Sequence, residues 1–181
     1  MAKIAAMIDL ETLDTENSAQ ILTLGAVKFD PDTKSEPYAE LYLKPDIDEQ
    51  EALGRTVSES TLNDFWAHQP ENIILEAFSE DDRISLDSLL DQLTKWLVGV
   101  DTIISQGHMD TNILEHLYKQ MNRPVPWPHW KIDNSRSVFK MMPIDPRKAY
   151  SFDAHNALED ARTQARAFQD VIQHFDTKYR T

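Results

Sequence analysis

Three apolar segments within the first 43 residues constrain the fold more than any other feature of the chain. They cover residues 3–8, 21–29 and 38–43, and each has the length and the aliphatic or aromatic content of a β-strand. Pro31-Asp32 lies between the second and third segments and indicates a hairpin turn there. The sequence therefore predicts that the fold opens with a three-stranded antiparallel meander.

The remainder of the chain alternates between helical and strand patterns. Leucines recur at helical spacing from Leu86 to Leu97, and an apolar stripe from Leu158 to Phe175 indicates a long final helix. The order of strands and helices predicts an α/β fold with a mixed sheet flanked by helices. With 181 residues, 41% of them hydrophobic, we expect a single domain over residues 1–181. The other predicted elements are helices over 60–69 and 113–121 and strands over 102–105 and about 131–139.

Composition excludes several classes of protein. Cysteine is absent, which rules out disulfides, thiolate zinc sites and cysteine nucleophiles. No apolar run approaches the roughly 20 residues of a membrane span, and Met1-Ala2-Lys3 leads into a strand pattern and not into a secretory signal. We therefore expect a cytoplasmic protein, or a phage protein in its host's cytoplasm, with no membrane partner.

The charge of the chain is unevenly distributed. The net charge is −13, yet residues 1–118 hold 24 acids and 7 bases, whereas residues 119–181 hold 7 acids and 11 bases. An acidic body of charge −17 thus carries a flank of charge +4. This asymmetry indicates either a phosphate-facing side beside a metal site or chance variation in a soluble surface.

Asp9-Leu10-Glu11 ends the first apolar segment. Residues two apart on a strand project to the same face, so the two carboxylates are expected to converge. Adjacent buried anions are costly unless a cation neutralises them, which indicates a metal site. The pattern alone is weak, because a second triplet, Asp14-Thr15-Glu16, follows in a polar loop.

Further acids stand at predicted helix starts. Asp110 follows a strand-to-helix turn, where an acid can cap the helix or bind a ligand. Asn156 and Glu159 have capping-box spacing, so the final helix is predicted to start at Asn156, with Asp160 in its first turn.

Two histidines lie close to these acids in the sequence. His155 comes just before the final helix and can reach one site together with Asp160, although a lone histidine there is more often structural. His108 precedes Asp110 and is either a polar turn residue or a ligand. Serine hydrolase, P-loop and zincin chemistry lack their motifs, since no G-x-S-x-G, glycine-rich phosphate loop or H-E-x-x-H is present.

Taken in order, Asp9-x-Glu11, Asp110 and His155-x4-Asp160 resemble the DEDDh family of 3′-to-5′ exonucleases, over nearly the whole chain. The resemblance implies a ribonuclease H-like fold and two divalent ions, Mg²⁺ or Mn²⁺, which suit oxygen ligands. It implies that Asp9 bridges both ions, that Glu11 and Asp160 complete the first site, and that Asp110 supports the second. His155 would be the general base, because neutral imidazole accepts a proton near pH 7.

Within that family, the chain looks most like the subgroup of phage exonuclease A and bacterial ribonuclease AS. Ser60-Thr61, Phe65-Trp66 and Gln69 carry this likeness, together with the segment from Trp130 to Arg136. Two departures are Met109, where the family usually has Phe, and Phe65, where the subgroup tends to have Trp. The substrate contacts that the resemblance implies are Thr12, Leu13, Phe65, Trp66 and Arg136.

We therefore predict an enzyme that removes nucleotides from the 3′ end of single-stranded DNA or RNA. Since several relatives are dimers, a homodimer is a further expectation. The alternative is a catalytically inactive acidic protein on the same fold that binds metal or a protein partner.

Overall fold

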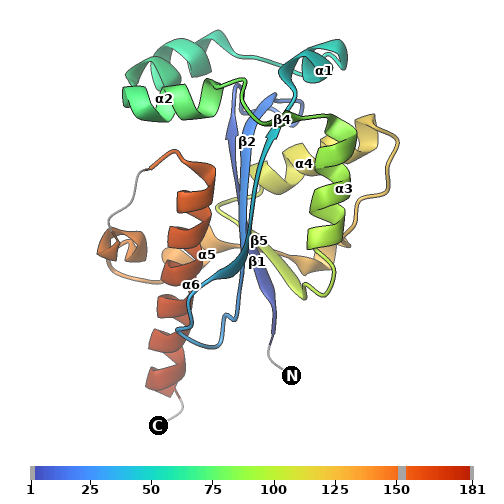
Figure 1. Ribbon diagram of the computed structural model, residues 1–181. Helices are drawn as coiled ribbons and strands as arrows, with labels where there is room; N and C mark the ends of the chain where they lie inside the picture. Colours follow the sequence, from blue (N-terminus) through green and yellow to red (C-terminus); the bar gives the residue numbers. More distant parts are fainter. Residues whose placement is uncertain (1–2, 151–153, 180–181) are drawn as a thin grey trace.

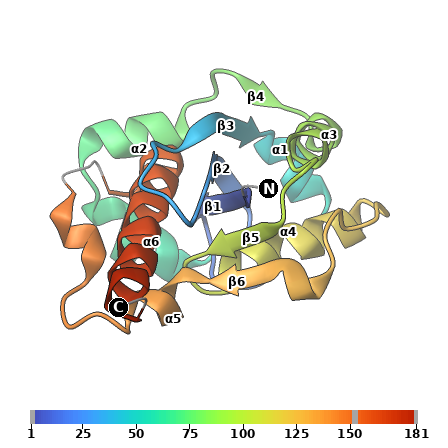
Figure 2. The same cartoon turned by 90° about the horizontal axis from the view of Figure 1, so that it is seen from below.

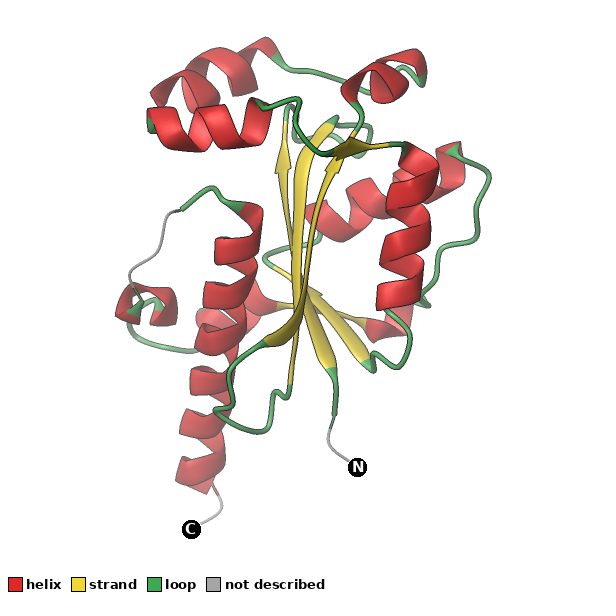
Figure 3. Cartoon of the chain, viewed as in Figure 1, coloured by secondary structure: helices red, strands yellow, loops and turns green. Residues whose placement is uncertain are grey.

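The computed structural model describes residues 3–150 and 154–179, and its centre is a six-stranded sheet (Figures 1 and 3). The strand order is β4-β3-β2-β1-β5-β6. The strands are β1 (Ala5–Thr12), β2 (Ile21–Phe29), β3 (Tyr38–Pro45), β4 (Arg83–Ile84), β5 (Thr102–Ser105) and β6 (Ile132–Asn134).

Strand pairing makes the sheet mixed. β1, β2 and β3 form the predicted antiparallel meander. β5 pairs parallel with β1, β6 pairs parallel with β5, and β4 pairs parallel with β3. The predicted α/β class with a mixed sheet is thus confirmed.

Helices cover both faces of the sheet (Figures 1 and 2). α3 (Leu86–Trp96) and α4 (Met109–Gln120) lie on one face, and α5 (Ser135–Phe139) and α6 (Ala157–Tyr179) lie on the other. α1 (Ile47–Ala52) and α2 (Glu71–Phe78) lie near the end of the sheet where β1 terminates. Short helical turns cover Thr61–Phe65, Trp66–His68, His129–Lys131 and Pro146–Ala149. No described helix is long and apolar enough to cross a membrane.

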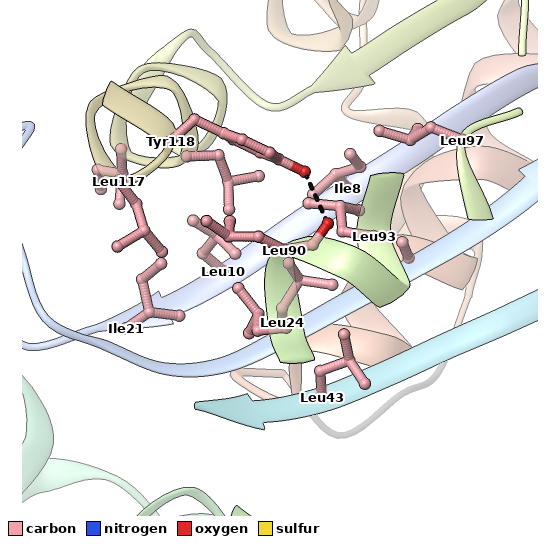
Figure 4. Close-up of a cluster of buried hydrophobic side chains, with 14 of the residues drawn as sticks. Ile8, Leu10, Ile21, Leu24, Leu43, Leu90, Leu93, Leu97, Leu117 and Tyr118 are labelled. Carbon is pink, nitrogen blue, oxygen red and sulfur yellow. Dashed lines mark hydrogen bonds between the residues drawn. The ribbon is translucent and has the colours of Figure 1, made fainter. Parts of the chain in front are cut away.

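Alternation along β1 divides its side chains between two cores. Ile8 and Leu10 point toward α3 and α4, where they join a leucine-rich cluster in which the Tyr118 hydroxyl donates to the Leu90 carbonyl at 3.2 Å (Figure 4). Ala5 and Met7 point the other way, toward α6. Asp9 and Glu11 continue this second set, so strand geometry alone directs both carboxylates toward α6.

The strand predicted over about 131–139 is wrong beyond Asn134. β6 ends there, and Ser135–Phe139 form α5 instead. Asn134 caps this helix, because its side-chain oxygen accepts a hydrogen bond from the Arg136 N–H at 2.9 Å. β1 includes Asp9-Leu10-Glu11 near its end, as predicted, and continues to Thr12.

Candidate active site

Gly25 on β2 allows α6 to begin against the sheet. Gly25 pairs with Asp9, and a Cβ atom on Gly25 would lie 2.2 Å from the Ala157 carbonyl carbon. Any side chain here would therefore push the first turn of α6 away. Asn156 caps that turn as predicted, since its Oδ1 accepts from the Glu159 N–H at 3.1 Å. Together these features set Asp160 beside β1.

Three carboxylates meet at this point. One ligand oxygen from each of Asp9, Glu11 and Asp160 lies within 4.8 Å of the other two. Asp9 and Asp160 are half-buried and Glu11 is buried. Three anions this close repel one another, and oxygen atoms at such spacing can share a divalent cation.

Burial and mutual repulsion raise the pKa values of this group. Burial is the largest cause for Asp9, whose pKa is raised well above its usual value, with further contributions from Asp110, Asp160 and Glu11. Burial and the charges of Asp160 and Asp110 raise the pKa of Glu11 to about 8. Burial also raises the pKa of Asp160. A bound cation would relieve this accumulated negative charge.

Asp110 adjoins the three carboxylates through the backbone of β1. Its Oδ1 accepts a hydrogen bond from the Leu10 N–H at 3.0 Å, between the two acids of the triplet. Burial raises the pKa of Asp110 to about 6, although its backbone hydrogen bonds and the charge of Arg136 oppose the rise. Asp110 therefore links α4 to β1 and also adds negative charge beside Asp9.

The turn that carries Asp110 is tied to α5. Gly107 has a φ of 116°, a conformation that favours glycine. Its N–H donates to Asn134 Oδ1 at 3.1 Å, the same oxygen that caps α5. His108 lies in this turn as an exposed residue, and its side chain does not cap α4.

His155 lies at the edge of the three-carboxylate group. Its backbone N–H donates to Asp160 Oδ2 at 2.7 Å, and its ring meets the Phe65 ring edge-on with centroids 4.8 Å apart. Its φ of 69° is uncommon for a residue with a side chain and is maintained by these contacts. The hydrogen bond to Asp160 is made by the backbone and leaves the imidazole nitrogens out of that contact.

Gln164 is a site residue that the sequence reasoning missed. It lies one turn after Asp160 on α6, is 1% exposed, and donates through Nε2 to Asp9 Oδ1 at 2.8 Å. Its Oε1 is buried without a hydrogen-bond partner among the described residues. The sequence did contain a signal for Gln164, because it lies four residues after Asp160 and positions four apart on a helix share a face.

The five predicted substrate contacts fall in three environments. Trp66 is 2% exposed and donates from Nε1 to the Thr12 carbonyl at 2.9 Å, and Leu13 packs in the same buried cluster. Phe65 and Thr12, by contrast, line a pocket of about 270 Å³ that also includes Glu11. Arg136 lies apart from these, exposed on α5, where its guanidinium donates to the Gln106 carbonyl at 3.2 Å.

Comparison with solved structures finds chains of similar fold. Cell-death related nuclease 4 matches with a TM-score of 0.62 and 18% identity over 96% of this chain and 64% of that chain. E. coli exonuclease I, in a complex with single-stranded DNA, matches with a TM-score of 0.62 and 12% identity over 99% of this chain and 42% of that chain. Exonuclease I from Methylocaldum szegediense matches with a TM-score of 0.57 and 11% identity over 97% of this chain and 43% of that chain.

These likenesses confirm the ribonuclease H-like fold. The chain spans 42–64% of the length of these three structures. No curated protein matches the sequence. The model of one family does match, over residues 5–172, and its description is the 3′-5′ exoribonuclease Rv2179c-like domain. The match covers both Asp9 and Asp160, and the chain therefore belongs to the Rv2179c-like 3′-5′ exoribonuclease domain family.

Proposed function

We propose that this protein hydrolyses single-stranded nucleic acid one nucleotide at a time from the 3′ end, with divalent cations held by its carboxylates. The observation that carries the proposal is the convergence of Asp9, Glu11 and Asp160 within 4.8 Å, in a chain of an exoribonuclease family. RNA is the first substrate to test, because the family is named for it.

The donor set fits Mg²⁺ or Mn²⁺. All of its side-chain ligands are carboxylate oxygens, which these hard cations prefer. Burial and mutual repulsion raise the pKa values of Asp9 and Glu11, and a bound cation would reduce that repulsion. Asp9, Glu11 and Asp160 would hold one ion, and Asp110, beside Asp9, would help to hold a second. Two such ions, when bound, stabilise charge on the phosphoryl oxygens and on the leaving oxygen.

His155 is proposed to take the proton from the attacking water. Its backbone bond to Asp160 and its ring contact with Phe65 hold the imidazole beside the carboxylates, and the bond to Asp160 uses no ring nitrogen. A neutral imidazole is a suitable base near pH 7.

The pocket that includes Glu11 is proposed to receive the 3′-terminal nucleoside. Leu10, Phe65 and Met109 supply apolar surface, and Thr12 also lines the pocket. A base can pack against such side chains whatever its sequence. A volume of about 270 Å³ suits one unpaired residue, which favours a single-stranded end.

Trp66 and Leu13 are proposed to act indirectly. Both are buried, and the Trp66 indole holds the Thr12 carbonyl, so they shape the pocket wall through Thr12. Arg136 is proposed to contact a substrate phosphate, since its side chain is exposed and its charge reaches Asp110.

The test uses RNA and DNA oligonucleotides labelled at either end, with Mg²⁺, Mn²⁺ or EDTA. We expect a stepwise ladder from the 5′-labelled strand and immediate release of a labelled mononucleotide from the 3′-labelled strand, in both cases only with metal. Asp110→Asn should remove this activity. Its matched control is Asp101→Asn, because Asp101 accepts the Ile4 N–H at 3.0 Å near the other end of β1. Internal cleavage, or activity in EDTA, would contradict the proposal.

A further inference from the structure

A second pocket lies beside the carboxylates and has the opposite charge. Its volume is about 470 Å³, and it lies between the end of β5, α5 and the turn Pro146–Ala149. Three cations and one anion line it, in a chain whose net charge is −13. The charged residues are Arg136, Lys140, Asp145 and Arg147.

Gln106 positions both arginines of this pocket. Its carbonyl accepts from Arg136 at 3.2 Å, and its side-chain oxygen accepts from Arg147 Nη1 at 2.6 Å. Gln106 lies in the turn that leads directly to Asp110. The two guanidinium groups are therefore fixed to the same segment that places a candidate metal ligand.

The arginines of this pocket also act electrostatically on the carboxylates. Burial raises the pKa of Asp110, and the charge of Arg136 opposes that rise. Burial likewise raises the pKa of Asp160, and the charge of Arg147 is among the influences that oppose it. Arg136 thus acts on Asp110, and Arg147 acts on Asp160.

We propose that this pocket binds a backbone phosphate upstream of the scissile bond, with Arg136, Lys140 and Arg147 as the contacts. The inference rests on the proposed function and extends it, because it assigns Lys140 and Arg147 and gives the path of the strand. With the terminal nucleoside in the pocket of Phe65 and an upstream phosphate here, the scissile phosphate lies at the carboxylates between them. Guanidinium groups suit phosphate oxygens, which they can bind in pairs.

Asp145 reduces the positive charge of this pocket by pairing with Arg147. Arg147 donates to Asp145 through Nε at 3.1 Å and through Nη2 at 2.7 Å, and its guanidinium lies over the Phe139 ring, 5.8 Å from the ring centroid. A phosphate that binds Arg147 therefore competes with one carboxylate for its guanidinium.

The first experiment measures binding without turnover. Fluorescence anisotropy of a labelled octanucleotide is followed over a salt series, in an Asp9→Asn background with Mg²⁺. Arg147→Gln and Lys140→Gln should each weaken binding several-fold and reduce the slope of log K against log salt by about 0.7, the value for one phosphate contact on a single strand. Arg166→Gln is the matched control, because Arg166 pairs instead with Glu36 at 2.6 Å.

Asp145→Asn distinguishes a phosphate-binding role of Arg147 from a purely structural one. If Arg147 binds phosphate, removing the competing anion should tighten octanucleotide binding. If the ion pair only braces the turn, the same change should weaken binding, and this result would overturn the assignment of Arg147. Melting temperatures of all variants identify any that fail to fold, and Arg147→Lys then tests whether charge at this position suffices.

The second experiment separates this inference from the proposed function. The p-nitrophenyl ester of thymidine 5′-monophosphate has a terminal nucleoside and a scissile phosphate but no upstream phosphate. In an otherwise wild-type background, Arg147→Gln should lower kcat/KM several-fold more for the octanucleotide than for the ester. Equal losses, or no loss of octanucleotide binding, would overturn the inference. If the variants weaken octanucleotide binding as expected but the wild type hydrolyses neither substrate, the proposed function alone is refuted.

Discussion

Two Asp-x-Glu triplets lie close together in this chain and have different environments. Asp9-Leu10-Glu11 is in β1, where both acids face α6 and meet Asp160. Asp14-Thr15-Glu16 is in the loop after β1, where Asp14 is half-buried and Glu16 is exposed. The Asp14 side chain caps its own loop by accepting the Thr15 N–H at 2.7 Å.

The difference shows that the triplet pattern alone carries little information. A strand directs residues two apart to one face, and Gly25 lets a helix bring a third acid to that face. The loop triplet has neither feature. Among the described residues, its acids therefore join no group of converging carboxylates, whereas those of β1 form a group suited to a cation.

The largest expected difference is between two variants that each lose one acid of a triplet. Asp9→Asn should reduce exonuclease activity to background, because Asp9 lies at the centre of the carboxylate group. Glu16→Gln should leave activity unchanged. The measurement is the single-turnover rate on a 5′-labelled oligonucleotide. Comparable losses in the two variants would mean that the β1 triplet has no special role.

His155→Ala should lower the single-turnover rate by roughly 10² to 10⁴, the range typical of losing a general base. Metal binding, followed by calorimetry, should persist, since the contact with Asp160 is made by the backbone of His155. His129→Ala, a histidine beside Trp130 and outside the site, is the control. Loss of a metal site in His155→Ala would show that this residue is a ligand.

Divalent cations should raise the melting temperature of the wild type. A ligand that binds only the native state stabilises it by about 2.7 kcal/mol at 100 times its dissociation constant. Asp9→Asn should lose this response, while Glu16→Gln should keep it. Equal responses in all three proteins, measured by calorimetry with Mn²⁺, would place the bound ion elsewhere in this acidic chain.

Without metal, stability should fall as pH rises. Glu11 has a folded pKa of about 8 and Asp110 of about 6, both above their usual values of 4.5 and 3.8. The folded state therefore holds more protons than the unfolded state between these limits, so the free energy of unfolding decreases through this window. Urea titrations from pH 5 to about 8 in EDTA should show this decrease, a smaller one in Asp9→Asn, and a wild-type profile in Glu16→Gln. A free energy that rises over this range would contradict the buried-acid account.

The smallest effect is expected at Gln164. Gln164→Leu removes one hydrogen bond to Asp9, worth roughly 0.5–1.5 kcal/mol, so kcat should fall about two- to tenfold. KM should change little. Gln169→Leu is a matched control on the same helix, because its side chain binds the Asp30 carbonyl at 3.0 Å instead. If kcat falls more in Gln169→Leu than in Gln164→Leu, both substitutions act through the folding of α6 and not through Asp9.

Much of the scaffold could be predicted because its signals are local. The meander follows from three apolar segments, and the start of α6 follows from the capping residue Asn156. The step from β6 to α5 was missed because the apolar residues Val138 and Phe139 extend a strand-like pattern, although Asn134 was an available helix-start signal.

Features that depend on contacts between distant segments could not be predicted. The burial of Trp66 depends on Thr12, which lies 54 residues earlier. The cationic pocket depends on Gln106 contacting both Arg136 and Arg147. Neither pairing leaves a periodic pattern in the sequence, so only the folded chain reveals them.

The central claim is that the acids of β1 and α6 form a site for divalent cations, and manganese location by anomalous diffraction tests it most directly. Crystals soaked with Mn²⁺ should show an anomalous peak coordinated by Asp9, Glu11 and Asp160. In crystals of Asp160→Asn the same peak should be absent or lower. Manganese bound at Asp14 and Glu16, with none at Asp9, would contradict the account.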